Sequence, residues 1–205
     1  MTAIIRDSPI LLVRETDGVA IDLAPLQGLW TVDQYLKLTD HTHCLVEFSD
    51  GNLEVLPMPT QRHQMILAFL YRVFFAFLHP RGGLVLFAPL RLQVSPATFR
   101  EPDLLLLLRA DDPRAQNRYW LGADLVLEVV SEDDPERDTV GKVRDYAGAG
   151  IPEYWIVNPQ DETITVLSLT DNAYTPLGVF RRGDQATSAL LEGFSVSVDE
   201  ACSAS

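Results

Sequence analysis

The chain has 205 residues, of which 47% are hydrophobic, and a net charge of −13. This length allows one well-buried core and argues against two independent domains. The charge opposes the broad attraction to nucleic acid that an excess of Lys and Arg provides. No apolar run reaches the roughly 18 residues of a membrane-spanning helix, and no signal-peptide pattern occurs. We expect a soluble, cytoplasmic protein without a membrane partner, with a single domain over residues 1–205 (core about 30–195).

The charge does not exclude a nucleic-acid substrate, because a local basic track can lie on an acidic body. Seven arginines are candidates for such a track: Arg62, Arg72, Arg81, Arg91, Arg100, Arg109 and Arg114. Other classes are excluded more firmly. The sequence has no glycine-rich phosphate loop and no nucleophile elbow, and its two cysteines lie far apart, which indicates neither a disulfide framework nor a zinc site.

The first third of the chain predicts a short helix and a hairpin. Thr31 and Gln34 form a capping-box pattern ahead of apolar residues at helical spacing, which predicts a helix near residues 31–39. Two β-rich runs then flank Asp50-Gly51, a pair that tolerates the positive φ angles of a tight turn. These runs predict a hairpin with Glu47 on its first strand.

The rest of the chain predicts an α/β fold with a central mixed β-sheet flanked by helices. Residues 61–79 are apolar on nearly every side and stop at Pro80, which suits a buried helix that forms one wall of the core. A second helix is expected over residues 136–148. Continuous apolar runs predict strands covered on both faces near residues 85–94, 103–108, 123–130 and 153–158. The runs ETITVLSLT and AYTPLGVF predict a C-terminal meander.

Two carboxylates lie in or beside strands that are otherwise apolar. Asp103 follows Pro102 at the start of one strand, and Glu128 lies inside another, LVLEVV. Carboxylates rarely enter such runs unless their desolvation is compensated, and a divalent cation is a common way to compensate it. Magnesium binds one or two carboxylates together with waters and phosphate oxygens. Lys142, on the helix after Glu128, is suited to orient an attacking water or to stabilise charge on a phosphate.

The sequence around these residues resembles a known family. The blocks EPDLLLLL and ADLVLEVVSEDDPERDTVGKVRDYAGAGIPEYWIVNP are similar to the bacterial Uma-type family of restriction endonucleases, within the PD-(D/E)xK nuclease superfamily. The resemblance extends from the helix at Thr31 to LLEGFSVSVDE. It implies a restriction-endonuclease-like core with an N-terminal hairpin and a C-terminal meander. It also implies hydrolysis of phosphodiester bonds in DNA with Mg²⁺ or Mn²⁺.

The resemblance implies roles for particular residues. Asp103 and Glu128 correspond to metal ligands, and the main-chain carbonyl of Val129 is a plausible additional ligand. The superfamily motif has its lysine two residues after the glutamate, where this chain has Val130. The resemblance therefore implies that Lys142 supplies the ammonium group instead.

Two further positions match the family pattern. Glu47 corresponds to an acidic residue before the hairpin turn, which is expected to complete the metal site directly or through water. His63 corresponds to a position at the start of the long helix, to which we assign no catalytic step. Because cutting both strands of a duplex calls for two sites related by a two-fold axis, we also expect a homodimer.

Each candidate also has a plain structural interpretation. Asp103 suits the cap of a turn at a strand entry, and Glu128 suits a buried salt bridge with Lys142 or Arg144. Lys142 taken alone is typical of a solvated helix residue, and a glutamate on a hairpin such as Glu47 is commonly exposed.

Three other features favour structural interpretations. His63 suits helix-start packing, and Tyr154 and Trp155 are more typical of a core than of a base-stacking platform. The acidic run at residues 132–134 is typical of a solvated loop before a helix.

Two other functions stay open from the sequence. One is a catalytically inactive nuclease-fold module that binds nucleic acid or forms oligomers, which the acidic charge supports. The other is a metal-dependent phosphohydrolase that acts on small nucleotides, which needs no basic track.

Overall fold

The computed structural model describes residues 11–13, 16–42, 44–131 and 135–204, apart from the side chain of Leu12. Contacts divide the chain into two compact units, residues 1–57 and 58–205, and each is described by itself. The single domain expected from the sequence stays a prediction. The acidic run 132–134, expected to be a solvated loop, lies outside the described residues.

The first unit contains a short strand pair, a helix and a hairpin. Its elements in chain order are β1 (Leu11–Val13), β2 (Ala20–Asp22), η1 (Ala24–Leu26), α1 (Val32–Thr39), β3 (Val46–Ser49) and β4 (Asn52–Val55). The predicted capping box is present at the start of α1. The Thr31 hydroxyl accepts from the Gln34 amide at 3.3 Å, and the Gln34 side-chain oxygen accepts from the Thr31 amide at 2.9 Å. This confirms the helix predicted near residues 31–39.

The hairpin predicted around Asp50-Gly51 is also confirmed. Strands β3 and β4 pair antiparallel, and the two turn residues have φ angles of 46° and 84°. Gly51 is required by a close approach as well, because a Cβ there would lie 2.6 Å from the carbonyl oxygen of Gly28. In return, the Gly28 amide donates to the Gly51 carbonyl at 2.8 Å. This contact ties the segment before α1 to the hairpin turn.

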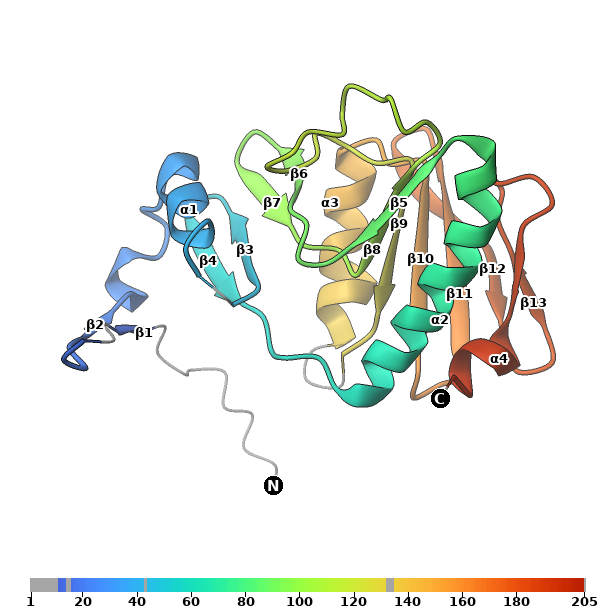
Figure 1. Cartoon of the computed structure of the whole chain (residues 1–205), viewed down its shortest axis with the longest axis horizontal. Coiled ribbons are helices and arrows are strands. Elements are labelled where there is room, and N and C mark those ends of the chain that lie inside the picture. Colours follow the sequence, from blue (N-terminus) through green and yellow to red (C-terminus); the bar gives the residue numbers. More distant parts are fainter. Residues whose placement is uncertain (1–10, 14–15, 43, 132–134, 205) are drawn as a thin grey trace. The chain divides into compact units, whose positions relative to one another are not determined.

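The second unit is an α/β structure around a mixed sheet. Its elements are α2 (Gln61–Leu78), η2 (His79–Arg81), β5 (Leu84–Phe87), β6 (Leu92–Ser95), β7 (Thr98–Arg100), β8 (Leu104–Leu107), β9 (Leu125–Val129), η3 (Arg137–Gly141), α3 (Lys142–Gly148), β10 (Glu153–Asn158), β11 (Thr163–Thr170), β12 (Ala173–Phe180), β13 (Gln185–Thr187), β14 (Ser195–Ser197) and α4 (Val198–Cys202). Six strands form one sheet in the order β12-β11-β10-β9-β8-β5 (Figure 1). Strands β9 and β10 are parallel and the other neighbours antiparallel, which confirms the predicted mixed sheet. The pairing of β10, β11 and β12 is the predicted C-terminal meander.

Helices pack on both faces of this sheet. Side chains alternate along β8, so Leu104 and Leu106 join Phe74 of α2 in one apolar cluster. Leu105, in contrast, joins Tyr146 of α3 in a second cluster. The central strands are therefore buried on both sides, as their continuous apolar runs predicted.

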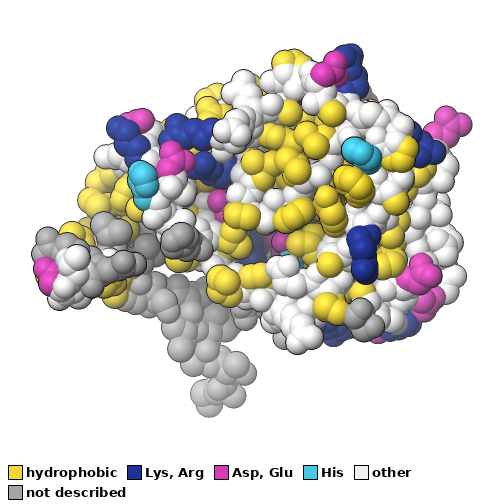
Figure 2. Space-filling model, viewed as in Figure 1, with side chains coloured by type: hydrophobic (Ala, Val, Ile, Leu, Met, Phe, Trp, Pro, Cys, Tyr) yellow, Lys and Arg dark blue, Asp and Glu magenta, His cyan; other side chains and the backbone are white. Residues whose placement is uncertain are grey.

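Helix α2 is buried along one side only, which differs from the prediction. The expectation was a buried helix, but Phe75 is 39% exposed, and Phe87 on β5 is 49% exposed. The Tyr71 ring lies 5.6 Å from the Phe75 ring and 5.1 Å from the Phe87 ring. Hydrophobic side chains gather on the face seen in Figure 2.

No helix in the described part of the chain is long and apolar enough to span a membrane.

The strand predicted over residues 85–94 is wrong as a single element. It is two strands, β5 and β6, separated by a segment that contains Pro89. Proline lacks the amide hydrogen that a continuous ladder needs. Strand β5 pairs with β8 in the six-stranded sheet, whereas β6 pairs with β7.

The helix predicted over residues 136–148 begins with a π-helical segment. Residues Arg137–Gly141 form η3, and the Lys142 amide bonds to the Arg137 carbonyl five residues earlier. The α-helix α3 follows directly. Such segments are rare and occur frequently at functional sites.

A buried carboxylate fixes the C-terminal segment to the sheet. Glu153 on β10 is 1% exposed. One of its oxygens accepts from the Trp155 indole and the Ser188 hydroxyl, each at 2.7 Å. The other accepts from the amides of Ala189 and Leu190 at 2.7 and 2.9 Å. Four donors thus offset the desolvation of this charge.

Trp155 is fully buried, and so is its neighbour Tyr154, which confirms the core prediction for this pair.

We predict that Glu153→Gln lowers the free energy of unfolding by about 2 kcal/mol, because an amide replaces one acceptor and leaves buried N–H groups unpaired. Urea unfolding measures the loss. Glu162→Gln is the matched control, since Glu162 binds Arg182 in an exposed ion pair and its loss is expected to be smaller. Equal losses in the two variants would contradict the role of Glu153.

Candidate active site

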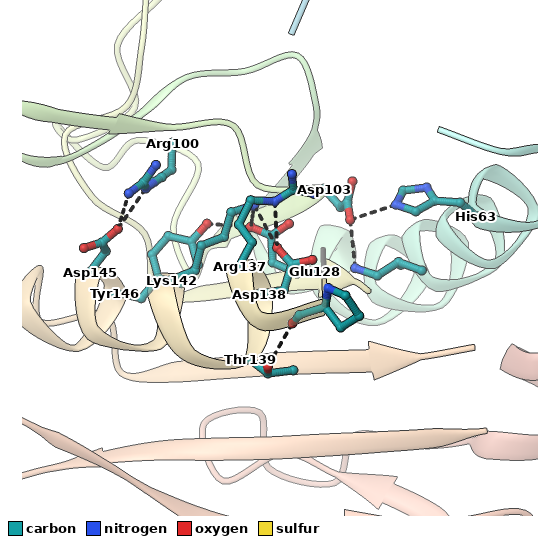
Figure 3. Close-up of polar contacts among 12 residues, drawn as sticks. His63, Arg100, Asp103, Glu128, Arg137, Asp138, Thr139, Lys142, Asp145 and Tyr146 are labelled. Carbon is teal, nitrogen blue, oxygen red and sulfur yellow. Dashed lines mark hydrogen bonds and ion pairs between the residues drawn. The ribbon is translucent and has the colours of Figure 1, made fainter. Parts of the chain in front are cut away.

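The two predicted metal ligands lie on neighbouring strands. Strands β8 and β9 are antiparallel, with Leu104 opposite Leu127. One step further along this register, Asp103 stands opposite Glu128. Glu128 alternates with Val126, which belongs to the apolar cluster on the α3 side, so the Glu128 side chain lies on that side. The register brings together two acids that are far apart in sequence (Figure 3).

Lys142 is buried against two carboxylates. It is the first residue of α3, and its side chain is 3% exposed. Its ammonium nitrogen lies 2.9 Å from Glu128 Oε1 and 3.2 Å from Asp138 Oδ1. The buried ion pair that the sequence left open as a structural interpretation of Glu128 is therefore present. Lys142 is not the solvated helix residue that its position alone would suggest.

Tyr146 provides a second donor to Glu128. Its hydroxyl donates to Glu128 Oε1 at 2.6 Å, so the same carboxylate oxygen contacts both Tyr146 and Lys142. Asp138, Lys142 and Tyr146 follow one another at a spacing of four, which places them on one side of the helix. The spacing alone does not show that Tyr146 and Lys142 share one oxygen.

Asp103 is held at one oxygen by two donors. Its Oδ2 accepts from the Val129 amide at 2.8 Å and lies 3.1 Å from His63 Nε2. No other hydrogen bond reaches this carboxylate from the described part of the chain. Its side chain is 17% exposed. The contact with Val129 is long-range, so Asp103 is not the local turn cap of the structural interpretation. A role of the Val129 carbonyl as a ligand stays a prediction.

The pKa values of two groups beside this cluster are raised. Burial opposes protonation of His63, but the hydrogen bond and charge of Asp103 and the charge of Asp138 outweigh burial and raise the pKa of His63. The pKa of Tyr154 is well above its usual range, first because of burial and then because of the charges of Glu128, Asp138 and Asp103.

The residues present fit a cation that completes its shell with water and substrate. No group of three or more His, Cys, Asp or Glu side chains among the described residues is arranged to hold a metal ion. The described residues therefore do not provide a complete set of protein ligands for a metal ion. Magnesium needs only one or two carboxylates, with waters and phosphate oxygens in its other positions. The facing pair of Asp103 and Glu128 suits that chemistry.

Glu47 belongs to the other unit of the chain. It lies on β3, as predicted, and its side chain is fully buried. The structural interpretation of Glu47 as an exposed hairpin residue is therefore wrong. Its participation in the metal site stays a prediction.

A small pocket lies beside His63. It is lined by the first turn of α2 and by the segments that follow β9 and β10, including Thr60, Arg62, Ser131 and Pro159. Arg62 donates from its guanidinium to the Pro159 carbonyl at 2.6 Å. The pocket offers a basic side chain next to the residue that contacts Asp103.

Comparison with known proteins places the chain in a family. The family model described as "Putative restriction endonuclease" (Uma2) matches residues 32–199. The chain belongs to the Uma2 family. This confirms the family resemblance seen in the sequence.

The nuclease-like fold of the Uma2 chain is confirmed by a solved structure. The crystal structure of a "putative nuclease belonging to DUF820" from Anabaena variabilis ATCC 29413 matches with a TM-score of 0.72 and 20% identity. The match covers 85% of this chain and 98% of that one. At this identity the likeness concerns the fold alone. No curated protein matches.

We predict that Lys142→Met lowers the free energy of unfolding by about 3 to 5 kcal/mol, because it leaves Glu128 and Asp138 as buried charges without their ammonium partner. The double variant Lys142→Met/Glu128→Gln is expected to be more stable than the sum of the two single losses implies, by about 1 to 3 kcal/mol. Urea unfolding of the wild type, the two single variants and the double variant measures this coupling. Strictly additive losses would show that the two side chains act independently.

Proposed function

We propose that this chain is a divalent-metal-dependent endonuclease that hydrolyses phosphodiester bonds in DNA. One observation carries the proposal: Asp103, directly before β8, and Glu128 on the adjacent strand β9 lie at the same end of the β8–β9 pair, and Lys142 contacts Glu128 in a buried position. Membership of a restriction endonuclease family supports the same reaction.

In this proposal, Asp103 and Glu128 hold Mg²⁺ or Mn²⁺, and the Val129 carbonyl is an additional ligand. Such an ion, when bound, would supply a lowered pKa for a coordinated water and positive charge to offset the phosphate. Lys142 and Tyr146 bind one oxygen of Glu128 and fix the orientation of its carboxylate. The ammonium of Lys142 also supplies positive charge near the phosphate, where negative charge develops during attack.

Two further features belong to the proposal. Glu47 completes the metal site, directly or through water. The chain acts as a homodimer, because two sites related by a two-fold axis can reach both strands of a duplex. The family pattern at Glu47 and the symmetry of a duplex support these two statements.

A second candidate function follows from the arginines. Three of the seven candidates for a basic track are matched by acids of the chain itself. Arg100 binds Asp145, Arg109 binds Asp111, and Arg114 binds both Asp112 and Asp124. Paired arginines contribute less to phosphate binding along a polymer. This favours, as the alternative, a metal-dependent phosphohydrolase that acts on small nucleotides.

We predict that the purified protein relaxes and linearises supercoiled plasmid DNA with Mg²⁺ or Mn²⁺. Asp103→Asn and Glu128→Gln are each expected to reduce the cleavage rate by at least about 100-fold, because each removes a ligand charge. Glu192→Gln, a matched substitution of an exposed side chain, is expected to cleave like the wild type. Gel quantification at several times gives the rates.

Three other outcomes contradict this proposal in different ways. Cleavage that persists in both ligand variants would defeat the assignment of the site. Metal-dependent release of phosphate from nucleotides without plasmid cleavage would support the small-nucleotide alternative. No hydrolysis of either substrate, with intact binding of DNA, would support the inactive module.

A further inference from the structure

His63 reaches from α2 to the proposed metal site. The Thr60 hydroxyl caps α2 by accepting from the His63 amide at 3.2 Å, which fixes the first turn of the helix. From this turn the imidazole Nε2 lies 3.1 Å from Asp103 Oδ2, and the His63 side chain is 13% exposed (Figure 3). A capped helix end thus places the ring at a defined position beside the carboxylate.

The contacts of Asp103 are all on one oxygen. His63 Nε2 and the Val129 amide both approach Oδ2, while Oδ1 has no hydrogen-bond partner among the residues that the structure describes. Two donors on one oxygen prevent rotation of the carboxylate. The other oxygen is left for a ligand that the protein does not itself supply.

The second ring nitrogen of His63 shows that packing alone does not explain this arrangement. His63 Nδ1 is buried and has no hydrogen-bond partner within the described part of the chain. An unpaired buried polar atom destabilises a fold, so such groups are rare and concentrate where a site has another purpose. Because the ionised carboxylate only accepts hydrogen bonds, the proton of a neutral ring is assigned to Nε2.

Glu128 on β9 is likewise contacted by side chains of a helix. Lys142 and Tyr146 approach a single oxygen of that carboxylate from the α3 side. Helix α3 thus contacts Glu128 as helix α2 contacts Asp103, and the two helices pack on opposite faces of the sheet.

We propose that His63 is a positioning residue of the metal site, which holds one oxygen of Asp103 so that the other binds the cation. The inference rests on the proposed function, because it assumes that Asp103 is a ligand. Hydrogen-bond partners of metal ligands orient those ligands, and their loss typically weakens metal binding by about 10- to 100-fold. His63 does not contact the reacting atoms in this proposal.

The test measures Mn²⁺ binding by isothermal titration calorimetry, without a nuclease assay. His63→Leu removes the donor and is expected to weaken Mn²⁺ binding by about 10- to 100-fold. His63→Gln keeps an N–H donor at a similar reach and is expected to recover most of the affinity. His79→Leu makes the same change at an exposed histidine just after α2 and is expected to bind like the wild type. Urea unfolding of the same variants measures any loss of stability separately from the loss of affinity.

The outcomes separate this inference from the function on which it rests. If the wild type binds Mn²⁺ and His63→Leu binds it equally well, the positioning role is overturned while the metal site stands. If His63→Gln is as impaired as His63→Leu and both are destabilised, the ring serves packing and the inference fails. If the wild type binds no Mn²⁺ at millimolar concentration, the metal site itself is wrong, and the inference falls with it.

Discussion

The desolvation of two carboxylates is the constraint on which the second unit depends. Asp103 and Glu128 lie at the start of β8 and within β9, where neighbouring side chains are almost entirely apolar and water is largely excluded. A charge in such a place needs hydrogen-bond donors to offset its desolvation. A helix on each face of the sheet provides them. Helix α3 provides Lys142 and Tyr146 to Glu128, and helix α2 provides His63 to Asp103. The two helices that bury the sheet are therefore also the elements that hold its acids.

Two atoms at this site link the fold to the proposed chemistry. Burial opposes protonation of His63, but the hydrogen bond and charge of Asp103 outweigh it and raise the pKa of His63. A purely structural salt bridge would not require an oxygen of Asp103 and a nitrogen of His63 that have no hydrogen-bond partner among the described residues. A bound cation would be a partner for that oxygen of Asp103. Because Arg100 and Arg114 are already matched by acids, attraction of a polyanion would have to be local to the site.

Periodicity and turn chemistry were sufficient to predict most of the fold, because α1, the β3–β4 hairpin and the buried strands each satisfy a local rule. Asp103 and Glu128 were predictable because a carboxylate in an apolar strand violates such a rule. The division of β5 from β6 was missed because the apolar run continues past Pro89, and no sequence signal marks the π-helical turns of η3. The contact between His63 and Asp103 depends on where the start of α2 meets β8, which no local pattern encodes. For Glu47, polarity on a hairpin suggested exposure, but tertiary packing buries it.

A crystal structure of the protein soaked with MnCl₂ tests the central claim most directly, because the anomalous signal of manganese locates the ion independently of the chemistry. We expect one ion bound between Oδ1 of Asp103 and the carboxylate of Glu128, with water in its remaining positions and His63 still in contact with Asp103. The account would be contradicted if, at saturating manganese, no anomalous peak appears beside these carboxylates and both keep only their protein partners.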